Sequence, residues 1–173
     1  MASRHFTPRS KLADCERVFA APRTEPQPIS DEEANEIERA VLLAVRLRGT
    51  VERDRHTREI ENIPGAEGPA RIGLALERLL AGLDTLGVNR ATALKVVKSV
   101  ALDSVPPNRR RAYEVLDTIG SAGASTTAVA TKLGLPTNTA RRILEDLTAY
   151  GLVERKPQGQ GKTDNWARLP CEE

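Results

Sequence analysis

Residues 161–163 read Gly-Lys-Thr, a triplet that ends many phosphate-binding loops and could therefore belong to a nucleotide site. A loop of that kind also needs a glycine five positions before the glycine of the triplet, a strand ahead of it and a helix behind it. Lys156 stands where that first glycine should be, and Pro170 follows soon after Thr163. We therefore expect no helix N-terminus here that could hold a phosphate, and no nucleotide site.

A β-hairpin explains the same stretch better. An eight-residue polar loop, 157–164, lies between two short runs of strand-forming residues, 152–155 and 166–169. Trp166 begins the second run and is expected to anchor it in the core. The loop would then form a flexible tip that carries the positive charge of Lys162.

Residue types that catalyse reactions or bind metals are sparse in this chain. Cys15 and Cys171 lie far apart in polar sequence, and two cysteines do not make a disulfide framework, so both are interpreted as incidental thiols. The histidines, His5 and His56, have no Cys or His at ligand spacing, which argues against a zinc site. The usual hydrolytic and redox motifs are also absent. We expect a protein that is not an enzyme and needs no cofactor.

The composition indicates a globular protein with a helical core. Hydrophobic residues make up 39% of the 173 residues and charged residues 29%, while aromatic residues make up only 3%. No apolar run approaches the ~20 residues needed to span a bilayer, and no cleavable leader is visible, so a cytoplasmic protein without membrane contact is expected. The formal net charge of +2 does not by itself indicate nucleic-acid binding.

Helices are expected in most of the first 106 residues. Prolines in residues 1–28 predict a mobile N-terminal segment or linker, which could contain a short helix at 10–21. Ser30 and Glu33 fit a capping box, which predicts a helix from there to about Arg48. Two more helices are expected at 70–83 and 89–102, and the charged segment 50–69 is interpreted as a solvated connection or a short helix. The residues expected to face the core are Ile37, Val41, Ala44, Val45, Arg48, Ile72, Leu76, Leu79, Leu80, Leu83, Leu94, Val97, Val100 and Ala101.

Residues 107–173 predict a different arrangement. Three helices, at about 108–119, 125–133 and 136–150, are followed directly by the hairpin. A short helix, a tight turn and a longer helix make the order of a helix-turn-helix. The expected fold is therefore mainly α: a helical bundle at 29–106, then a winged helix-turn-helix at 107–173 with a small β-hairpin wing.

The sequence of residues from about 109 to 169 resembles the winged helix-turn-helix of the MarR-like and ArsR-like transcription regulators of bacteria. Its most specific part is "LEDLTAYGLVERK", in which a helix ends at Gly151 and a strand of alternating apolar and charged residues begins. The resemblance implies binding of double-stranded DNA, in transcription control or in DNA handling by a mobile-element or ATPase assembly. Many such regulators bind as two-fold dimers.

In that interpretation the third helix enters the major groove, and the wing lies on the DNA backbone. Backbone N–H groups at the start of the second helix would hold another phosphate. Four acids, Glu145, Asp146, Glu154 and Asp164, weaken the positive field. The candidate DNA-binding residues are Ser125, Thr126, Thr137, Asn138, Thr139, Arg141, Arg142, Arg155, Lys156 and Lys162, with Arg168 beside the wing. The arginine triplet 109–111 is interpreted as a solvated helix start.

Residues 68–106 resemble a second family, the helical lid of MoxR-like AAA+ ATPases, in which a Gly-x-x-Arg motif opens one helix. The resemblance implies that Arg71 would sense a nucleotide phosphate, but only beside an ATPase core. This sequence has no Walker A loop and no hydrophobic strand that ends in paired acids. The chain could therefore be the lid and winged helix of a longer ATPase. A dimerisation or effector-sensing bundle, a small-molecule sensor and a protein-binding winged helix stay open as alternatives.

Overall fold

The computed structural model describes residues 24–159 and 163–170. The helix expected at 10–21, both cysteines and Lys162 lie outside these described residues. In the described part, no helix is long and apolar enough to cross a membrane.

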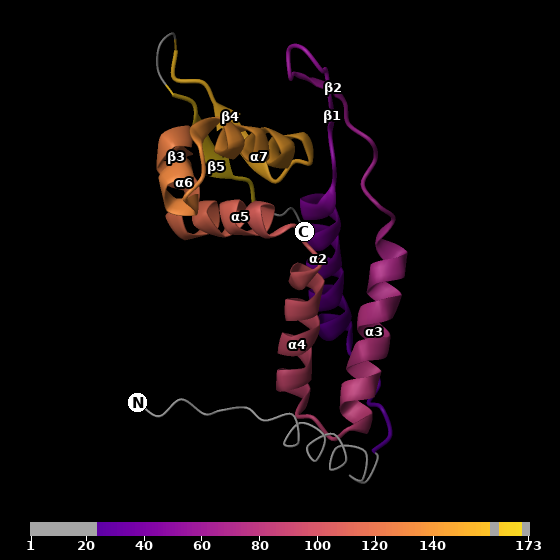
Figure 1. The fold of residues 1–173 in the computed structure, drawn as a ribbon. Coiled ribbons are helices and arrows are strands. Elements are labelled where there is room, and N and C mark those ends of the chain that lie inside the picture. The colour runs from indigo at the N-terminus through magenta and orange to yellow at the C-terminus, as the bar shows by residue number, and fades with distance from the viewer. Residues whose placement is uncertain (1–23, 160–162, 171–173) are drawn as a thin grey trace, which may run out of the picture.

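Three helices form a bundle in the lower half of the molecule in Figure 1: α2 (Asp31–Arg48), α3 (Pro69–Thr85) and α4 (Arg90–Asp103), each packed against the other two. The capping box at the start of α2 is confirmed, since the Ser30 hydroxyl accepts a hydrogen bond from the Glu33 N–H and the Glu33 carboxylate accepts one from the Ser30 N–H. Most residues expected to face the core are buried, among them Ile37, Val41, Ala44, Val45, Leu76, Leu80, Val97 and Ala101.

Two of the inward predictions are wrong. Val100 is 43% exposed, because the side of α4 that packs against α2 and α3 carries Ala93, Val97 and Ala101, at four-residue spacing. At the end of α2, Leu47 is buried in place of Arg48, whose guanidinium lies 3.2 Å from the carboxylate of Glu67. In both cases a neighbouring position on the same helix fills the core.

Arg90 joins the three bundle helices through two carboxylates. Its guanidinium donates two hydrogen bonds of 2.7 Å to Glu33 on α2 and another to the buried Asp84 on α3. The hydrogen bond from Arg90, with the one from the Ser30 N–H, lowers the pKa of Glu33 to about 2. The burial of Asp84 could not be predicted from the sequence, because its carboxylate is held by Arg90 of α4 and by the N–H of Gln27, which precedes α2.

The winged helix-turn-helix forms as expected. Its helices are α5 (Pro107–Ile119), α6 (Thr126–Leu133) and α7 (Thr137–Ala149), with a short 3₁₀ turn, η1 (Gly120–Ala122), after α5. Its strands β3 (Ala124–Ser125), β4 (Val153–Lys156) and β5 (Asn165–Arg168) make an antiparallel sheet in the order β3-β5-β4. Gly123 permits the close approach of β3 to β5, since its φ is +69° and a Cβ there would lie 2.7 Å from the Trp166 carbonyl oxygen.

A second hairpin, β1 (Glu52–Arg53) and β2 (Ile60–Asn62), occupies the charged segment 50–69. The expected short helix is therefore wrong. These strands are only two and three residues long and mostly polar, so they carry no apolar alternation that could be read from the sequence. The Asp54 carboxylate closes the turn by accepting hydrogen bonds from the N–H groups of His56 and Thr57, at 2.8 and 2.7 Å.

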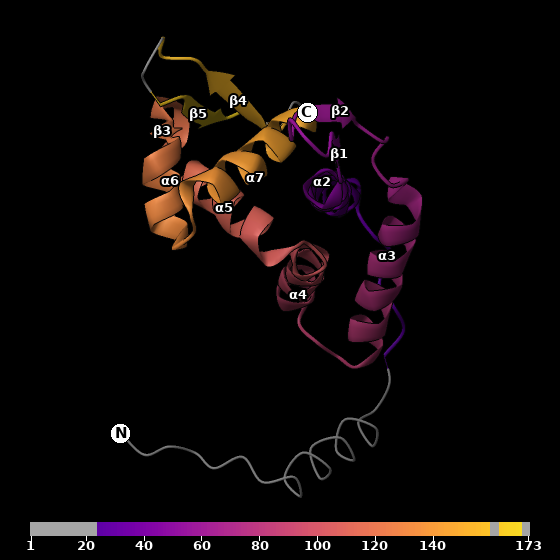
Figure 2. The ribbon, with the colours of Figure 1, turned by 45° about the horizontal axis from the view of Figure 1, so that its top comes forward.

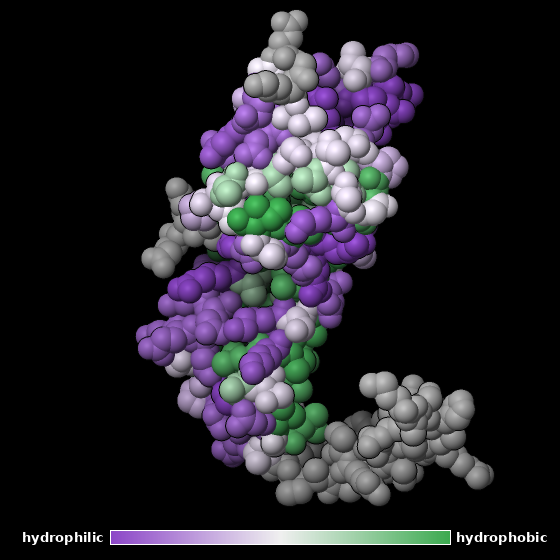
Figure 3. All heavy atoms as spheres, turned by 90° about the vertical axis from the view of Figure 1, so that its left-hand side faces the viewer, coloured by the Kyte–Doolittle hydropathy of each residue, from purple (hydrophilic) through white to green (hydrophobic). Residues whose placement is uncertain are grey.

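The buried apolar side chains form one continuous cluster from α2 to β5. Figures 1 and 2 show the β1–β2 hairpin and the β4–β5 wing at the same end of the molecule, on either side of α7. Figure 3 shows hydrophobic patches over the bundle on one face, while hydrophilic residues cover most of the end from which the wing projects. The polar end of the molecule therefore carries α7 and two projecting hairpins.

Candidate nucleic-acid interface

Trp166 holds the wing against the helices. Its side chain is fully buried, and its indole N–H donates a 2.8 Å hydrogen bond to the Thr126 hydroxyl at the start of α6. On the neighbouring strand, the guanidinium of Arg155 lies 5.6 Å from the centre of the indole ring. The predicted role of Trp166 as the anchor of the return strand is confirmed.

Helix α7 presents a polar face to solvent because its apolar residues use the opposite side. Ala140, Ile143, Leu144 and Leu147 are buried. The exposed residues of its first two turns are the five that were predicted to contact DNA on this helix: Thr137, Asn138, Thr139, Arg141 and Arg142. Sequence periodicity therefore predicted these five exposed positions correctly, while Glu145, which the same period turns outward, is partly buried against Arg53.

The acids on the second half of α7 are neutralised by arginines from other elements. Glu145 lies 2.9 Å from Arg53 of β1 and 2.9 Å from Arg141. Asp146 lies 2.5 Å from Arg53 and 2.8 Å from Arg109 of α5. The repulsion of DNA that these acids were expected to cause is thus reduced at the site itself.

Arg53 is the central cation of this network. Burial lowers the pKa of the Arg53 guanidinium, but hydrogen bonds to Asp146 and Glu145 outweigh that effect and raise its pKa overall. The group also donates to the Arg142 carbonyl oxygen at 3.2 Å. Because its guanidinium stays charged, Arg53 can compensate both acids whenever they are ionised.

Arg142 and Asn138 keep their side chains available. In the described part of the chain, neither side chain takes part in a hydrogen bond or an ion pair, whereas the guanidinium of Arg141 is shared with Glu145. Arginine can bind guanine through two hydrogen bonds, and asparagine can bind adenine in the same way. The first half of α7 thus offers two free side chains suited to base edges.

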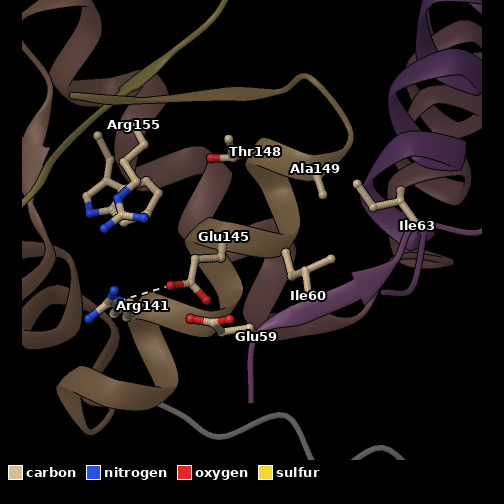
Figure 4. A pocket seen from close by; sticks show the side chains of 9 residues that line it. Glu59, Ile60, Ile63, Arg141, Glu145, Thr148, Ala149 and Arg155 are labelled. Atoms are coloured by element: carbon tan, nitrogen blue, oxygen red, sulfur yellow. Dashed lines mark hydrogen bonds and ion pairs between the residues drawn. The ribbon is translucent and has the colours of Figure 1, made fainter. Parts of the chain in front are cut away.

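A groove of about 490 Å³ runs over α7 between the two hairpins (Figure 4). Glu59, Ile60 and Ile63 of the β1–β2 hairpin line one side, and Arg155 and Trp166 of the wing line the other. The floor is the outward face of α7, formed by Arg141, Glu145, Thr148 and Ala149. The recognition helix therefore lies between two walls that come from separate parts of the sequence.

The two candidates at the start of α6 are engaged in holding the fold. The Ser125 hydroxyl accepts a 3.2 Å hydrogen bond from the Ala128 N–H and caps the helix. Thr126 is buried, its hydroxyl accepts from Trp166, and its N–H donates to the Asp164 carbonyl oxygen at 3.3 Å. A phosphate contact at these residues stays a prediction, and the existing partner of the Thr126 N–H disfavours it.

Two basic residues of the wing, Arg155 and Lys156, are exposed but paired. Arg155 lies 2.7 Å from Asp164, and Lys156 lies 3.1 Å from Glu154. These are surface ion pairs, which contribute little energy and can be exchanged for phosphate contacts. Arg168, expected beside the wing, instead turns to α5, where it binds the Tyr113 hydroxyl and the Asp117 carboxylate.

The arginine triplet 109–111 is built into the structure and is not simply solvated. Arg109 binds Asp146 and the Gly49 carbonyl oxygen, Arg110 binds Asp103 and Glu114, and Arg111 donates to the Leu133 carbonyl oxygen. Sequence reasoning missed this role for Arg109, and it missed Arg53 entirely. The partners of both arginines are distant in the sequence, so no local pattern marks them.

Arg71 lies on α3, at a distance from α7. Its side chain is 82% exposed and forms an ion pair with Glu67 one turn earlier. Among the described residues, no group of three His, Cys, Asp or Glu side chains could hold a metal ion.

Residues 110–157 match the sequence profile of the IclR helix-turn-helix domain. The match covers most of α5, all of α6 and α7, and strand β4. It names a winged-helix family other than the MarR-like and ArsR-like families, and it does not extend to residues 68–106. No curated protein and no solved structure matches the chain. The chain therefore carries a winged helix-turn-helix DNA-binding domain of the kind found in transcription regulators.

Proposed function

We propose that this helix-turn-helix domain recognises double-stranded DNA by inserting the first half of α7 into the major groove. Arg142 and Asn138 would contact base edges, and Thr137 and Thr139 would contact phosphates. Arg155, Lys156 and Lys162 of the wing would lie on the adjacent backbone, where they add affinity without reading sequence. The chain would act by binding and not by catalysis, in transcription control or another form of DNA handling.

One observation carries this proposal: the acids of α7 are neutralised by arginines, while basic and polar side chains nearer its N-terminus remain available. The acids of its second half are paired with Arg53, Arg109 and Arg141, while the side chains of Arg142 and Asn138 in the first half have no hydrogen-bond or ion-pair partner among the described residues. Unpaired donors of this kind on an exposed helix face suit the base edges and phosphates of DNA. This distribution of charge along α7 therefore favours DNA over a protein partner.

The proposal is tested by titrating a fluorescent random-sequence duplex with the unaltered chain at several salt concentrations. Each phosphate that a Lys or Arg neutralises is expected to contribute roughly −0.9 to the slope of log K against log salt, so the three wing cations predict a slope of about −3. A folded, monodisperse sample that fails to bind at low salt would exclude DNA recognition by the chain on its own.

A two-fold dimer would place two copies of α7 in successive major grooves, one helical turn apart. We propose such a dimer as the DNA-bound form, in the cytoplasm as expected for a bacterial-type regulator. The exposed Leu42 on α2 supports a contact through the bundle, because it is a large apolar side chain at the surface of the first bundle helix. Sedimentation with a duplex that carries two half-sites distinguishes one bound copy from two.

A second proposal is that residues 68–106 form the lid of a AAA+ ATPase. The exposure of Arg71 favours it, since a nucleotide-binding core supplied by another domain or subunit could reach this side chain. The Arg71 guanidinium would then exchange Glu67 for a nucleotide phosphate. ATP binding that appears only when a P-loop core is added, and that Arg71→Ala removes, would support this proposal, and equal binding by both forms would contradict it.

A further inference from the structure

We propose that the β1–β2 hairpin is a second DNA-binding arm, which holds the phosphate backbone with Arg55 and Arg58 on the side of α7 opposite the wing. This inference rests on the proposed function, because it adds contacts to the same bound duplex. It concerns a part of the chain that lies outside the matched residues 110–157.

The base of the hairpin is fixed to the recognition helix. Tyr150, directly after α7, places its hydroxyl 2.7 Å from the Thr50 carbonyl oxygen and 2.8 Å from that of Pro64. Gly49 lies against the same ring, where a Cβ would be only 2.2 Å from a ring carbon. Both ends of the hairpin segment therefore contact one side chain at the end of α7.

The middle of the hairpin is fixed as well. Arg53 binds Glu145, Asp146 and the Arg142 carbonyl oxygen, and its side chain is only 15% exposed. A surface loop without such contacts would move independently of α7. With them, the position of α7 on DNA also determines where the hairpin tip lies.

The tip presents cations and uses the Asp54 carboxylate within its own turn, while Glu59 beside Arg58 is exposed. The Asp54 carboxylate accepts hydrogen bonds from the N–H groups of Thr57 and His56, which lower the pKa of Asp54. Arg55, His56 and Arg58 are exposed, and in the described residues their side chains have no hydrogen-bond or ion-pair partner. Two free guanidinium groups thus extend from the tip into solvent.

The tip and α7 together line a polar cavity of about 360 Å³. Arg58 faces it from the hairpin, and Arg141 and Arg142 face it from the helix, with Asn138 and Thr57 beside them. Of the two acids that line it, Glu145 is already bound by Arg53 and Arg141, which leaves Glu59. Guanidinium groups from two elements give this space a positive charge that suits a backbone phosphate, which Arg58 would bind while Arg142 contacts the bases.

The arrangement of the two hairpins favours the DNA backbone as the occupant. The wing and the β1–β2 hairpin project from the same end of the molecule, with α7 between them (Figures 1 and 2). When a helix occupies the major groove, the two phosphate backbones run along either side of it. The wing would meet one backbone and the hairpin tip the other. The competing outcome is that the hairpin shields α7 from DNA.

The test compares Arg55→Gln/Arg58→Gln with Arg39→Gln/Arg78→Gln in the salt titration of the random duplex. The control pair is also exposed and loses the same charge, but it lies on α2 and α3. Loss of two phosphate contacts is expected to reduce the salt slope by roughly 2 and to weaken binding about tenfold or more near 0.1 M salt. Arg55→Lys/Arg58→Lys should keep most of the slope, because a lysine can still neutralise a phosphate.

The outcomes separate this inference from the proposed function. Unchanged slope and affinity in the Gln pair, with strong loss in an Arg141→Ala/Arg142→Ala chain, would overturn the arm alone. Tighter binding by the Gln pair would also overturn it and show that the hairpin shields α7. Failure of the unaltered chain to bind would overturn both proposals. Circular dichroism of each variant checks that the fold is intact.

Discussion

Replacing Arg141 and Arg142 together with alanine is expected to weaken binding to duplex DNA by roughly a hundredfold at constant salt. A well-placed arginine contributes about 1–3 kcal/mol to the recognition of a base pair, so a hundredfold loss, about 2.8 kcal/mol, lies at the low end of what two arginines can contribute. Most of the loss should come from Arg142, because its guanidinium is unpaired in the described structure, while that of Arg141 is shared with Glu145. Fluorescence anisotropy with a fixed duplex measures the change.

The matched control for this variant is Arg39→Ala/Arg78→Ala, which removes two exposed arginines from the bundle. A general dependence on net charge would weaken both chains equally. If the first half of α7 enters the major groove, the variant on α7 must lose far more affinity for DNA than the control. Equal losses would show that α7 has no special place in binding.

Replacing Trp166 with alanine is expected to lower the free energy of unfolding by about 3–5 kcal/mol. The side chain is fully buried, and strand β5 pairs with both β3 and β4, so the cavity would open where the wing joins the helices. Urea denaturation followed by circular dichroism measures the change, since the variant lacks the only tryptophan of the chain.

Trp166→Phe is the conservative comparison for this experiment. It keeps most of the apolar volume but loses the hydrogen bond from the indole N–H to Thr126. We expect a loss between that of the alanine variant and zero. A cost below about 1 kcal/mol for Trp166→Ala would contradict the role of this residue as the anchor of the wing.

Much of the fold could be predicted because its signals are local. The capping box of Ser30 and Glu33, the apolar period of α7 and the turn at Gly151 each lie within a few residues of the element that they define. The outward face of α7 follows directly from the same period. Trp166 could be assigned to the core because a hairpin strand must bury one of its faces.

The parts that could not be predicted depend on residues that are distant in the sequence. Arg53 compensates acids more than 90 positions later, and Arg90 binds Glu33 across 57 positions. The β1–β2 hairpin escaped notice for a related reason. Its charged side chains contact α7 or face solvent, and neither strand buries one of its faces. Its sequence therefore shows no alternation of apolar and polar residues. The cations that complete the candidate site therefore had to be found in the folded chain.

The central claim is that the first half of α7 enters the groove, and cleavage of bound DNA by an iron chelate tests it most directly. The chelate would be attached to Asn138→Cys, in a chain with Cys15→Ser and Cys171→Ser, and Arg78→Cys on α3 would serve as the control position. The account predicts strong hydroxyl-radical cuts on both strands of the bound duplex from position 138, and none above background from position 78. Cuts from position 78 alone, or equal cutting from both positions, would contradict it.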